Sequence, residues 1–305
     1  MGSEMCIRDR LGTKRSHANK CNLKQPDEGL DLMVRVLILL TALLVSITRG
    51  GNANWDSHSA HIMPSKKWSV GIFHPIRYGI KEGLELSSHP GWFLVLPNAS
   101  FKIHLSDFKS FRTATRVRFV YPTPLLNMVS REGIGGMIDP NLAIPPMLGI
   151  SGSLLMSKEL LGVNTTIKSG FDLGLVFGDL DARSNIDLPI IYHRLDVFHN
   201  GWGLHGGVDL ERALIRKLRI FMDLDLKLIP DLDTKGKTNN YSMRAGDYSI
   251  EHKLLLIWER SSTFRAMIGY KLVSGRYPYG KQTRLLPYIP LLEQWVPLIE
   301  LQWLR

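Results

Sequence analysis

The residues whose types suit them best for chemistry gather between positions 199 and 211. His199, His205, Asp209 and Glu211 combine imidazoles with carboxylates, and a histidine oriented by a carboxylate can act as the base that activates a nucleophile. These four are the lead for a catalytic site, and a lipid-acting ester hydrolase is the reaction they would serve. No serine stands two residues from His205, so a histidine bonded to its polar neighbours is the favoured reading, and the chain is expected not to be an enzyme.

The histidine set belongs to a stretch of chain that alternates between apolar and charged residues. The clearest case is Lys217–Ile229 (KLRIFMDLDLKLI): every even position is apolar, and the odd positions up to Lys227 are charged except for Phe221. Successive side chains of a strand point to opposite faces, so this pattern predicts a strand with one apolar and one ionic face. A helix would mix the two sets around its circumference.

The ionic faces indicate a wet interior. Arg112, Arg116 and Arg118 share one face of one predicted strand, and three arginines on one face must meet water or pair with acids across a lumen. A fully paired lumen would make a closed, rigid barrel, whereas an unpaired basic stripe would favour small anions. The residues predicted to line the lumen are Arg112, Arg116, Arg118, Lys168, Asp172, Lys217, Arg219, Asp223, Asp225, Lys227, Glu251, Lys253, Arg265 and Lys271.

Other segments bend or interrupt this rhythm. Gly170 and Gly174 fall on the polar face of a predicted strand, which suggests a crowded interior or a bent strand. Thr123-Pro124 predicts the start of a short helix near 124–131, with Thr as its cap, that plugs the barrel, lies at the membrane surface or packs outside the barrel. Residues 190–198 are expected to form a strand, and Asn200-Gly201 is typical of a hairpin turn.

The N-terminal part divides into an extension and a targeting segment. Residues 1–32 are polar and aperiodic and are expected to be a non-structural extension; residues 4–10 resemble translated adapter sequence. Arg35, the apolar run Val36–Ile47 and the small residues Gly51 and Ala53 predict a signal peptide at 33–53, with an uncleaved anchor as the alternative. The run is shorter than the roughly 20 residues of a transmembrane helix. Residues 54–66 are expected to be loose.

Composition narrows the function classes. Both cysteines, Cys6 and Cys21, precede the targeting segment, so a chain cleaved there has no disulfide framework and no thiolate metal site. No metal or cofactor is expected. The formal charge of +10 is spread through alternating strands without zinc-finger spacing or a basic helix, so nucleic acid is not an expected partner.

About twelve strands (10–14) fit into residues 54–305, which predicts an all-β, antiparallel transmembrane β-barrel. Alternation by itself also suits a soluble barrel turned inside out. The targeting segment, the width of a twelve-stranded lumen and the aromatic residues near strand ends favour lipid on the outside. Trp68, Trp92, Trp202 and Trp258 are among these aromatic residues.

Residues 67–305 resemble bacterial outer-membrane β-barrel proteins, most closely an uncharacterised group with strands such as GIFHPIRYGI, LELSSHP and GYKLVSGRYP. The resemblance implies a bacterial outer-membrane location, with outer-membrane lipid and the barrel-assembly machinery as partners. Many such barrels end in an aromatic residue, whereas this chain ends Trp303-Leu304-Arg305. The expected role is a structural or small-solute pore protein; the alternatives are an outer-membrane lipid-acting hydrolase and a surface-binding barrel that uses loops 230–246 and 274–290. Solute and oligomeric state stay open.

Overall fold

The computed structural model describes residues 55, 57–131, 138–181, 195–229, 247–277, 280–286, 288–289, 294–295 and 298–305. These lie within the compact unit Leu44–Arg305. The predicted extension at 1–32 and signal peptide at 33–53 lie outside the described residues, as does loop 230–246.

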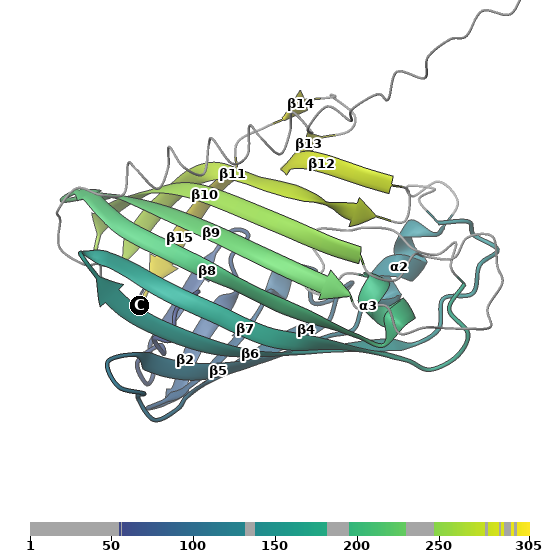
Figure 1. Cartoon of the computed structure of the whole chain (residues 1–305), viewed down its shortest axis with the longest axis horizontal. Helices are drawn as coiled ribbons and strands as arrows, with labels where there is room; N and C mark the ends of the chain where they lie inside the picture. Colours follow the sequence, from purple (N-terminus) through teal and green to yellow (C-terminus); the bar gives the residue numbers. More distant parts are fainter. Residues whose placement is uncertain are drawn as a thin grey trace, which may run out of the picture. The chain divides into compact units, whose positions relative to one another are not determined.

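Twelve antiparallel strands close into a barrel, and each strand pairs with the one before and after it in the chain (Figure 1). The predicted all-β fold and strand number are confirmed. The strands are β1 (Trp68–Gly71), β2 (Ile76–Lys81), β3 (Leu84–Ser88), β4 (Asn98–His104), β5 (Arg112–Val120), β6 (Met147–Leu160), β7 (Val163–Val176), β8 (Trp202–Ile215), β9 (Leu218–Ile229), β10 (Asp247–Ser261), β11 (Phe264–Tyr277) and a last strand made of β12 (Gly280–Leu286) and β15 (Leu298–Leu304).

The last strand is in two pieces that share one edge of β11. β15 pairs with residues 264–269 of β11, and β12 pairs with residues 271–277. Between the two pieces, β13 (Tyr288–Ile289) and β14 (Gln294–Trp295) form a separate two-stranded ribbon. β15 also pairs with β1, which closes the ring.

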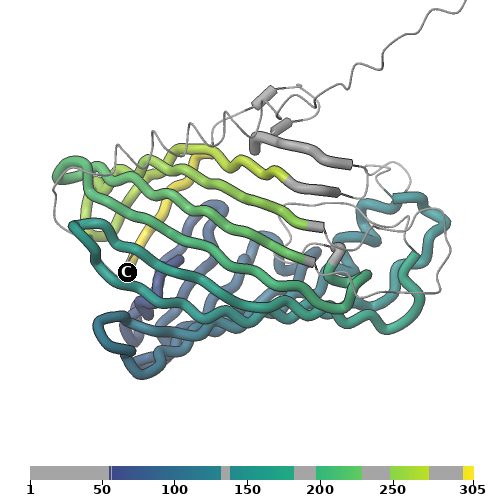
Figure 2. Tube along the Cα trace, in the orientation of Figure 1, coloured from purple at the N-terminus to yellow at the C-terminus, as the bar shows by residue number. Residues whose placement is uncertain are grey.

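The two ends of the barrel have different connections. The turns at 82–83, 161–162, 216–217 and 262–263 lie at the end that also holds the C-terminus, and Gly83 and Gly162 take positive φ angles of 79° and 76° there. The long connections 89–97, 121–146 and 177–201 join the strands at the opposite end, and Figure 2 shows the described residues of 121–146 beyond the strand ends. The connection 105–111 between β4 and β5 is the longer exception at the C-terminal end. A contrast between short turns at one end and long loops at the other is typical of outer-membrane barrels.

Polarity across the barrel wall is inverted relative to a soluble protein. On β2, Arg77 is 2% exposed while its neighbour Tyr78 is 42% exposed; on β9, Arg219 is 5% and Leu228 is 42% exposed. The apolar rows therefore lie on the outside, as the alternation predicts. Exposed apolar strand residues include Ile76, Ile80, Phe101, Ile103, Leu154, Ile167, Phe171, Leu173, Leu175, Leu204, Leu226, Leu256, Trp258, Ile268, Ile299 and Trp303.

The predicted helix is present as α2 (Thr123–Val129) in the β5–β6 connection. Thr123 does not cap it. Its hydroxyl donates to the Pro145 carbonyl at 3.0 Å and accepts from the Met147 amide at 2.9 Å, so it ties the helix to the start of β6. Leu126 on α2 packs with Met147 in one buried apolar cluster. That cluster places the helix at the long-loop end.

A second helix, α3 (Leu195–Asn200), stands where the sequence predicts a strand and a hairpin. Both predictions are wrong for the described part. Gly201 has φ +86°, and its amide donates to the Val197 carbonyl at 2.8 Å, so it ends the helix. A helix C-terminus needs the same left-handed residue as a hairpin turn, which is why the dipeptide misleads. Phe198 of α3 joins the α2 cluster, and Figure 1 shows both helices at one end of the barrel.

Candidate functional site

The chain just before β1 runs through the interior of the barrel. The Trp55 carbonyl accepts from Arg77 Nη1 at 3.3 Å and from Arg265 Nη2 at 3.0 Å, and the Arg265 guanidinium lies 4.9 Å from the centre of the Trp55 ring. Arg116 Nη2 donates to the Ser57 carbonyl. Three buried arginines of the wall therefore bind the backbone and a ring of this segment, residues 55–64, called the inner segment below.

The inner segment stays fastened along its length. Lys102 Nζ donates to the His61 carbonyl at 2.6 Å, and the Met63 amide donates to Glu85 Oε2 at 2.8 Å. A Cβ placed on Gly79 would lie 2.0 Å from the Pro64 carbonyl oxygen, so the absence of a side chain there lets the segment lie against β2. The prediction that residues 54–66 are loose is wrong for the described residues, 55 and 57–66. Backbone carbonyls can bind wall cations whatever the side chains are, so this attachment leaves no periodic pattern in the sequence.

The opposite part of the lumen holds a dense ionic cluster around Lys168. Its Nζ lies 2.8 Å from Asp209 Oδ1, 2.8 Å from Asp223 Oδ1 and 2.6 Å from Asp225 Oδ1. Lys253 Nζ lies 3.0 Å from the other oxygen of Asp223. The strand pairing brings these residues together from β7, β8, β9 and β10.

Further ion pairs line the same wall. Glu251 lies 3.2 Å from Lys227 Nζ and 2.6 Å from Lys271 Nζ. Arg219 Nε lies 2.5 Å from Glu211. Lys168, Asp223, Asp225, Lys227, Glu251, Lys253 and Lys271 of the predicted lumen set therefore pair with one another or with Asp209, and Arg219 pairs with Glu211. Asp172 and Arg265 of that set instead contact His205 and the Trp55 carbonyl. In a low-dielectric interior such pairing offsets the cost of removing the charges from water.

Two predicted lumen residues lie elsewhere. Lys217 is exposed in the 216–217 turn, because the alternation of the sequence begins at Lys217, whereas β9 begins one residue later at Leu218. Arg112 starts β5 at the short-turn end and is exposed. Arg116 and Arg118 do line the lumen. Buried lumen residues that the sequence reasoning missed include Arg77, Glu85, Lys102, Glu300 and Gln302; their strands are short, so the alternating pattern was weak.

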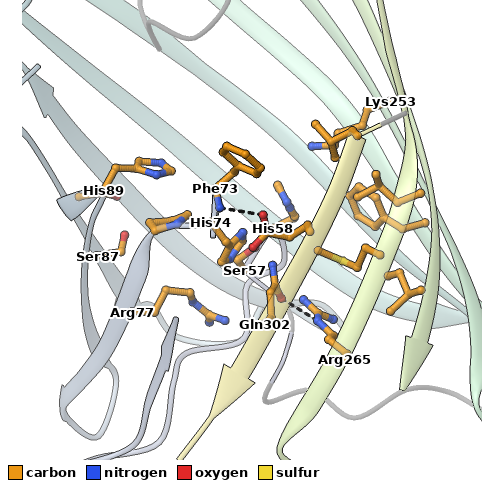
Figure 3. Close-up of a pocket in the computed structure, with 18 of the residues that line it drawn as sticks. Ser57, His58, Phe73, His74, Arg77, Ser87, His89, Lys253, Arg265 and Gln302 are labelled. Carbon is orange, nitrogen blue, oxygen red and sulfur yellow. Dashed lines mark hydrogen bonds between the residues drawn. The ribbon is translucent and has the colours of Figure 1, made fainter. Parts of the chain in front are cut away.

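A cavity of about 280 Å³ remains between the inner segment and the wall. Figure 3 shows Ser57, His58 and His74 beside it, with Gln302 and Arg265 on the strands opposite. Among the described residues, four buried polar atoms on its wall have no hydrogen-bond partner: Ser57 Oγ, His74 Nε2, Glu300 Oε1 and Gln302 Nε2. Buried polar groups normally find partners, so the cavity suits water or a small polar molecule.

The four residues of the catalytic lead are not brought together. His199 lies on α3 at the long-loop end, Asp209 binds Lys168, and Glu211 binds Arg219. His205 instead contacts two residues outside the lead: its Nε2 lies 2.8 Å from Ser153 Oγ, and its Nδ1 lies 3.1 Å from Asp172 Oδ2.

The barrel sheet builds this contact from a cross-strand row. Arg116 pairs with Ser153, Ser153 with Gly170, and Gly170 with His205, across β5, β6, β7 and β8. A Cβ on Gly170 would lie 2.5 Å from His205 Nε2, so the imidazole crosses over the glycine to reach the serine. The glycines on the polar face were the sequence signal of this crowding, but the serine stands two strands away from the histidine.

Two histidines at the long-loop end are held neutral. Burial lowers the pKa of His199 to about 4 against the opposing effect of Asp181. Burial and the positive charge of Arg118 lower the pKa of His89 to about 4. Neither group carries a charge at neutral pH.

Among the described residues, no cluster of three or more His, Cys, Asp or Glu side chains is arranged to hold a metal ion. Their helices are all too short or too polar to cross a membrane. Comparison with known proteins gives no matching family model, no matching curated protein and no matching solved structure.

Proposed function

We propose that this chain is an integral outer-membrane β-barrel protein whose lumen is closed at rest by its own inner segment. The carrying observation is the inverted polarity of the wall: Tyr78 and Leu228 are exposed while Arg77 and Arg219 are buried. Apolar rows around a closed sheet match a hydrocarbon surround, in which every backbone group must bond internally.

The targeting segment and the connections support the same location. A signal peptide at 33–53 would deliver the chain to the envelope. The two-residue turns and both termini of the barrel would then face the periplasm. Outer-membrane lipid and the assembly machinery are then the partners. His205 faces the lumen through its contact with Ser153, so a hydrolase site on the lipid-facing wall is not favoured. The surface-binding alternative rests on loops 230–246 and 274–290. The first lies outside the described residues, and the prediction of a loop at 274–290 is wrong for residues 274–277 and 280–286, which belong to β11 and β12.

The closed state follows from how the lumen is filled. Trp55, Ser57 and His61 give their carbonyls to wall cations, while Lys168 and Glu251 neutralise the far wall. An unpaired basic stripe would be needed for ready passage of anions. Small solutes can therefore enter the lumen from an end, but they cross it from one end to the other only when the inner segment leaves.

Two measurements test the proposal. The protein should fractionate with outer membranes and migrate differently on a gel before and after boiling; a soluble product without the shift contradicts the location. In planar bilayers the intact barrel should stay silent, and deletion of Trp55–Met63 should produce channels. A Lys217→Gln barrel, altered only in an exposed turn, is the control and should stay silent too. Channels in the intact protein, or silence after the deletion in a barrel that still shows the shift, contradict the closing role.

A further inference from the structure

We propose that Ser153, His205 and Asp172 form a nucleophile, base and orienting carboxylate that hydrolyse small carboxylic esters inside the lumen. The distances are 2.8 Å from Ser153 Oγ to His205 Nε2 and 3.1 Å from His205 Nδ1 to Asp172 Oδ2. This is the hydrogen-bonded order by which a serine hydroxyl is activated on several unrelated folds. The assignment concerns the lumen and stands apart from where the barrel resides.

The sheet fixes the three residues without a specialised loop. Ser153 and Asp172 face the interior from β6 and β7, and His205 reaches Ser153 across Gly170. A Cβ at Gly170 would collide with the imidazole and with the Gly152 carbonyl oxygen. Sites held by strands are more rigid than sites on loops, so the serine and histidine stay within hydrogen-bond reach.

Proton positions follow from the partners. In the tautomer with the proton on Nδ1, His205 donates to Asp172, and its Nε2 accepts the Ser153 hydroxyl. Ser153 is 7% and Asp172 is 6% exposed, while the His205 side chain keeps 16% exposure. The imidazole is therefore oriented by a buried carboxylate and still reaches lumen water.

The reaction proceeds in two balanced steps. Ser153 Oγ attacks the ester carbonyl carbon and forms a C–O bond while its proton moves to His205 Nε2; the ester C–O bond then breaks, and His205 returns the proton to the leaving alcohol. Water next attacks the acyl-serine and gives a proton to His205. The acyl–serine bond breaks, Ser153 Oγ regains the proton, and a carboxylic acid leaves.

The surroundings define the substrate class. Arg116 stands directly opposite Ser153 in the sheet, with Cβ atoms about 5 Å apart for such a pair. Its positive charge would stabilise the developing oxyanion through space, while its Nη2 stays on the Ser57 carbonyl. Ser153 and Asp172 are both buried, so only a small molecule can approach the serine hydroxyl. The substrate is therefore a short-chain ester with an uncharged or anionic acyl group rather than an intact two-chain lipid.

The test uses the full barrel in detergent micelles and the compact serine reagent diisopropyl fluorophosphate. Ser153 Oγ should displace fluoride and form a P–O bond, detected by peptide mass spectrometry. Ser151→Ala is the matched control, because Ser151 also lies buried on β6, two residues from Ser153, and its labelling should equal that of the parent. Ser153→Ala should abolish labelling, and His205→Gln should slow it at least tenfold.

A second readout separates activation from structure. Hydrolysis of p-nitrophenyl acetate should lose kcat at least tenfold in Asp172→Asn with little change in KM. Each variant is first checked for the heat-dependent gel shift of a folded barrel. If the folded parent leaves Ser153 unlabelled, or if folded His205→Gln labels as fast as the parent, the proposal is overturned.

Discussion

Buried cations are neutralised differently in the two halves of the lumen. In the long-strand half, β6 to β11, the strands have 12 to 15 residues, and Lys168 meets three carboxylates. In the short-strand half, β1 to β5, the strands have four to nine residues, and Arg77 and Lys102 share Glu85 and also bind carbonyls of the inner segment.

Strand length explains the difference. Every second residue of a strand faces inward, so β2 or β3 offers only two or three inner positions. β9 offers Arg219, Asp223, Asp225 and Lys227 on one inner face, which is enough to carry both signs. A short strand with a cation at one inner position has few positions left for a carboxylate. Backbone carbonyls of the inner segment therefore accept hydrogen bonds from these cations instead.

The largest loss of folding stability is expected from a substitution of Lys168, at the centre of the long-strand half. Lys168→Met leaves Asp209, Asp223 and Asp225 without their shared amine, although Lys253 stays on Asp223. An uncompensated buried charge costs about 3–5 kcal/mol, so the free energy of unfolding in urea should fall by about that amount.

The matched change is Lys271→Met, which leaves Lys227 on Glu251. It should lower the free energy of unfolding by about 1 kcal/mol, because one partner of the carboxylate persists. Equal losses in the two variants would mean that the number of shared carboxylates does not govern stability in this half.

The next largest loss of stability is expected in the short-strand half, where the inner segment packs against β2. Gly79→Ala places a Cβ against the Pro64 and Met63 carbonyl oxygens, so the inner segment must move off β2. Overpacking of this kind costs about 1–3 kcal/mol, and amide hydrogen exchange should speed up in residues 57–66. The control is Gly91→Ala, where a Cβ meets nothing within 4 Å; unchanged exchange in Gly79→Ala would show that the segment does not depend on this contact.

Low pH is expected to destabilise the long-loop end through its two buried histidines. His199 and His89 have pKa values lowered to about 4 by burial, below the usual 6.5 of the unfolded chain. The unfolded state therefore binds protons first, so stability is complete above about pH 6.5 and is lost as the pH falls toward 4. The free energy of unfolding in urea should be measured at pH 7.5 and pH 4.5. The decrease between the two should be about 1–2 kcal/mol smaller in His199→Gln than in the parent. An identical pH dependence in the variant would contradict this origin.

The smallest effect is predicted outside both halves. Lys217→Gln changes an exposed residue of the 216–217 turn, so the free energy of unfolding should stay within about 0.5 kcal/mol of the parent. Lys227→Gln removes a half-buried partner of Glu251 and should cost more. Reversal of that order would place Lys217 in the ionic network after all.

Much of the fold could be predicted because the long strands repeat a period of two over many residues. The Lys217–Ile229 pattern, for instance, matches β9 except at Lys217. The inner segment and α3 could not be found this way. Carbonyls of the inner segment bind wall cations whatever its side chains are, and Asn200-Gly201 suits a helix end as well as a turn. Of the proposed ester site, sequence reasoning singled out His205 as a catalytic lead and placed Asp172 in the lumen, but it missed Ser153.

The sequence by itself determined which side chains share a face of each strand, since that depends only on the alternation of neighbours along the chain. Ring closure and register decided the rest: which cation meets which carboxylate, what the N-terminal residues fill, and that Ser153 meets His205 over Gly170. Those contacts join residues up to 210 positions apart, and a distance of that kind is set by how strands pair rather than by any local pattern.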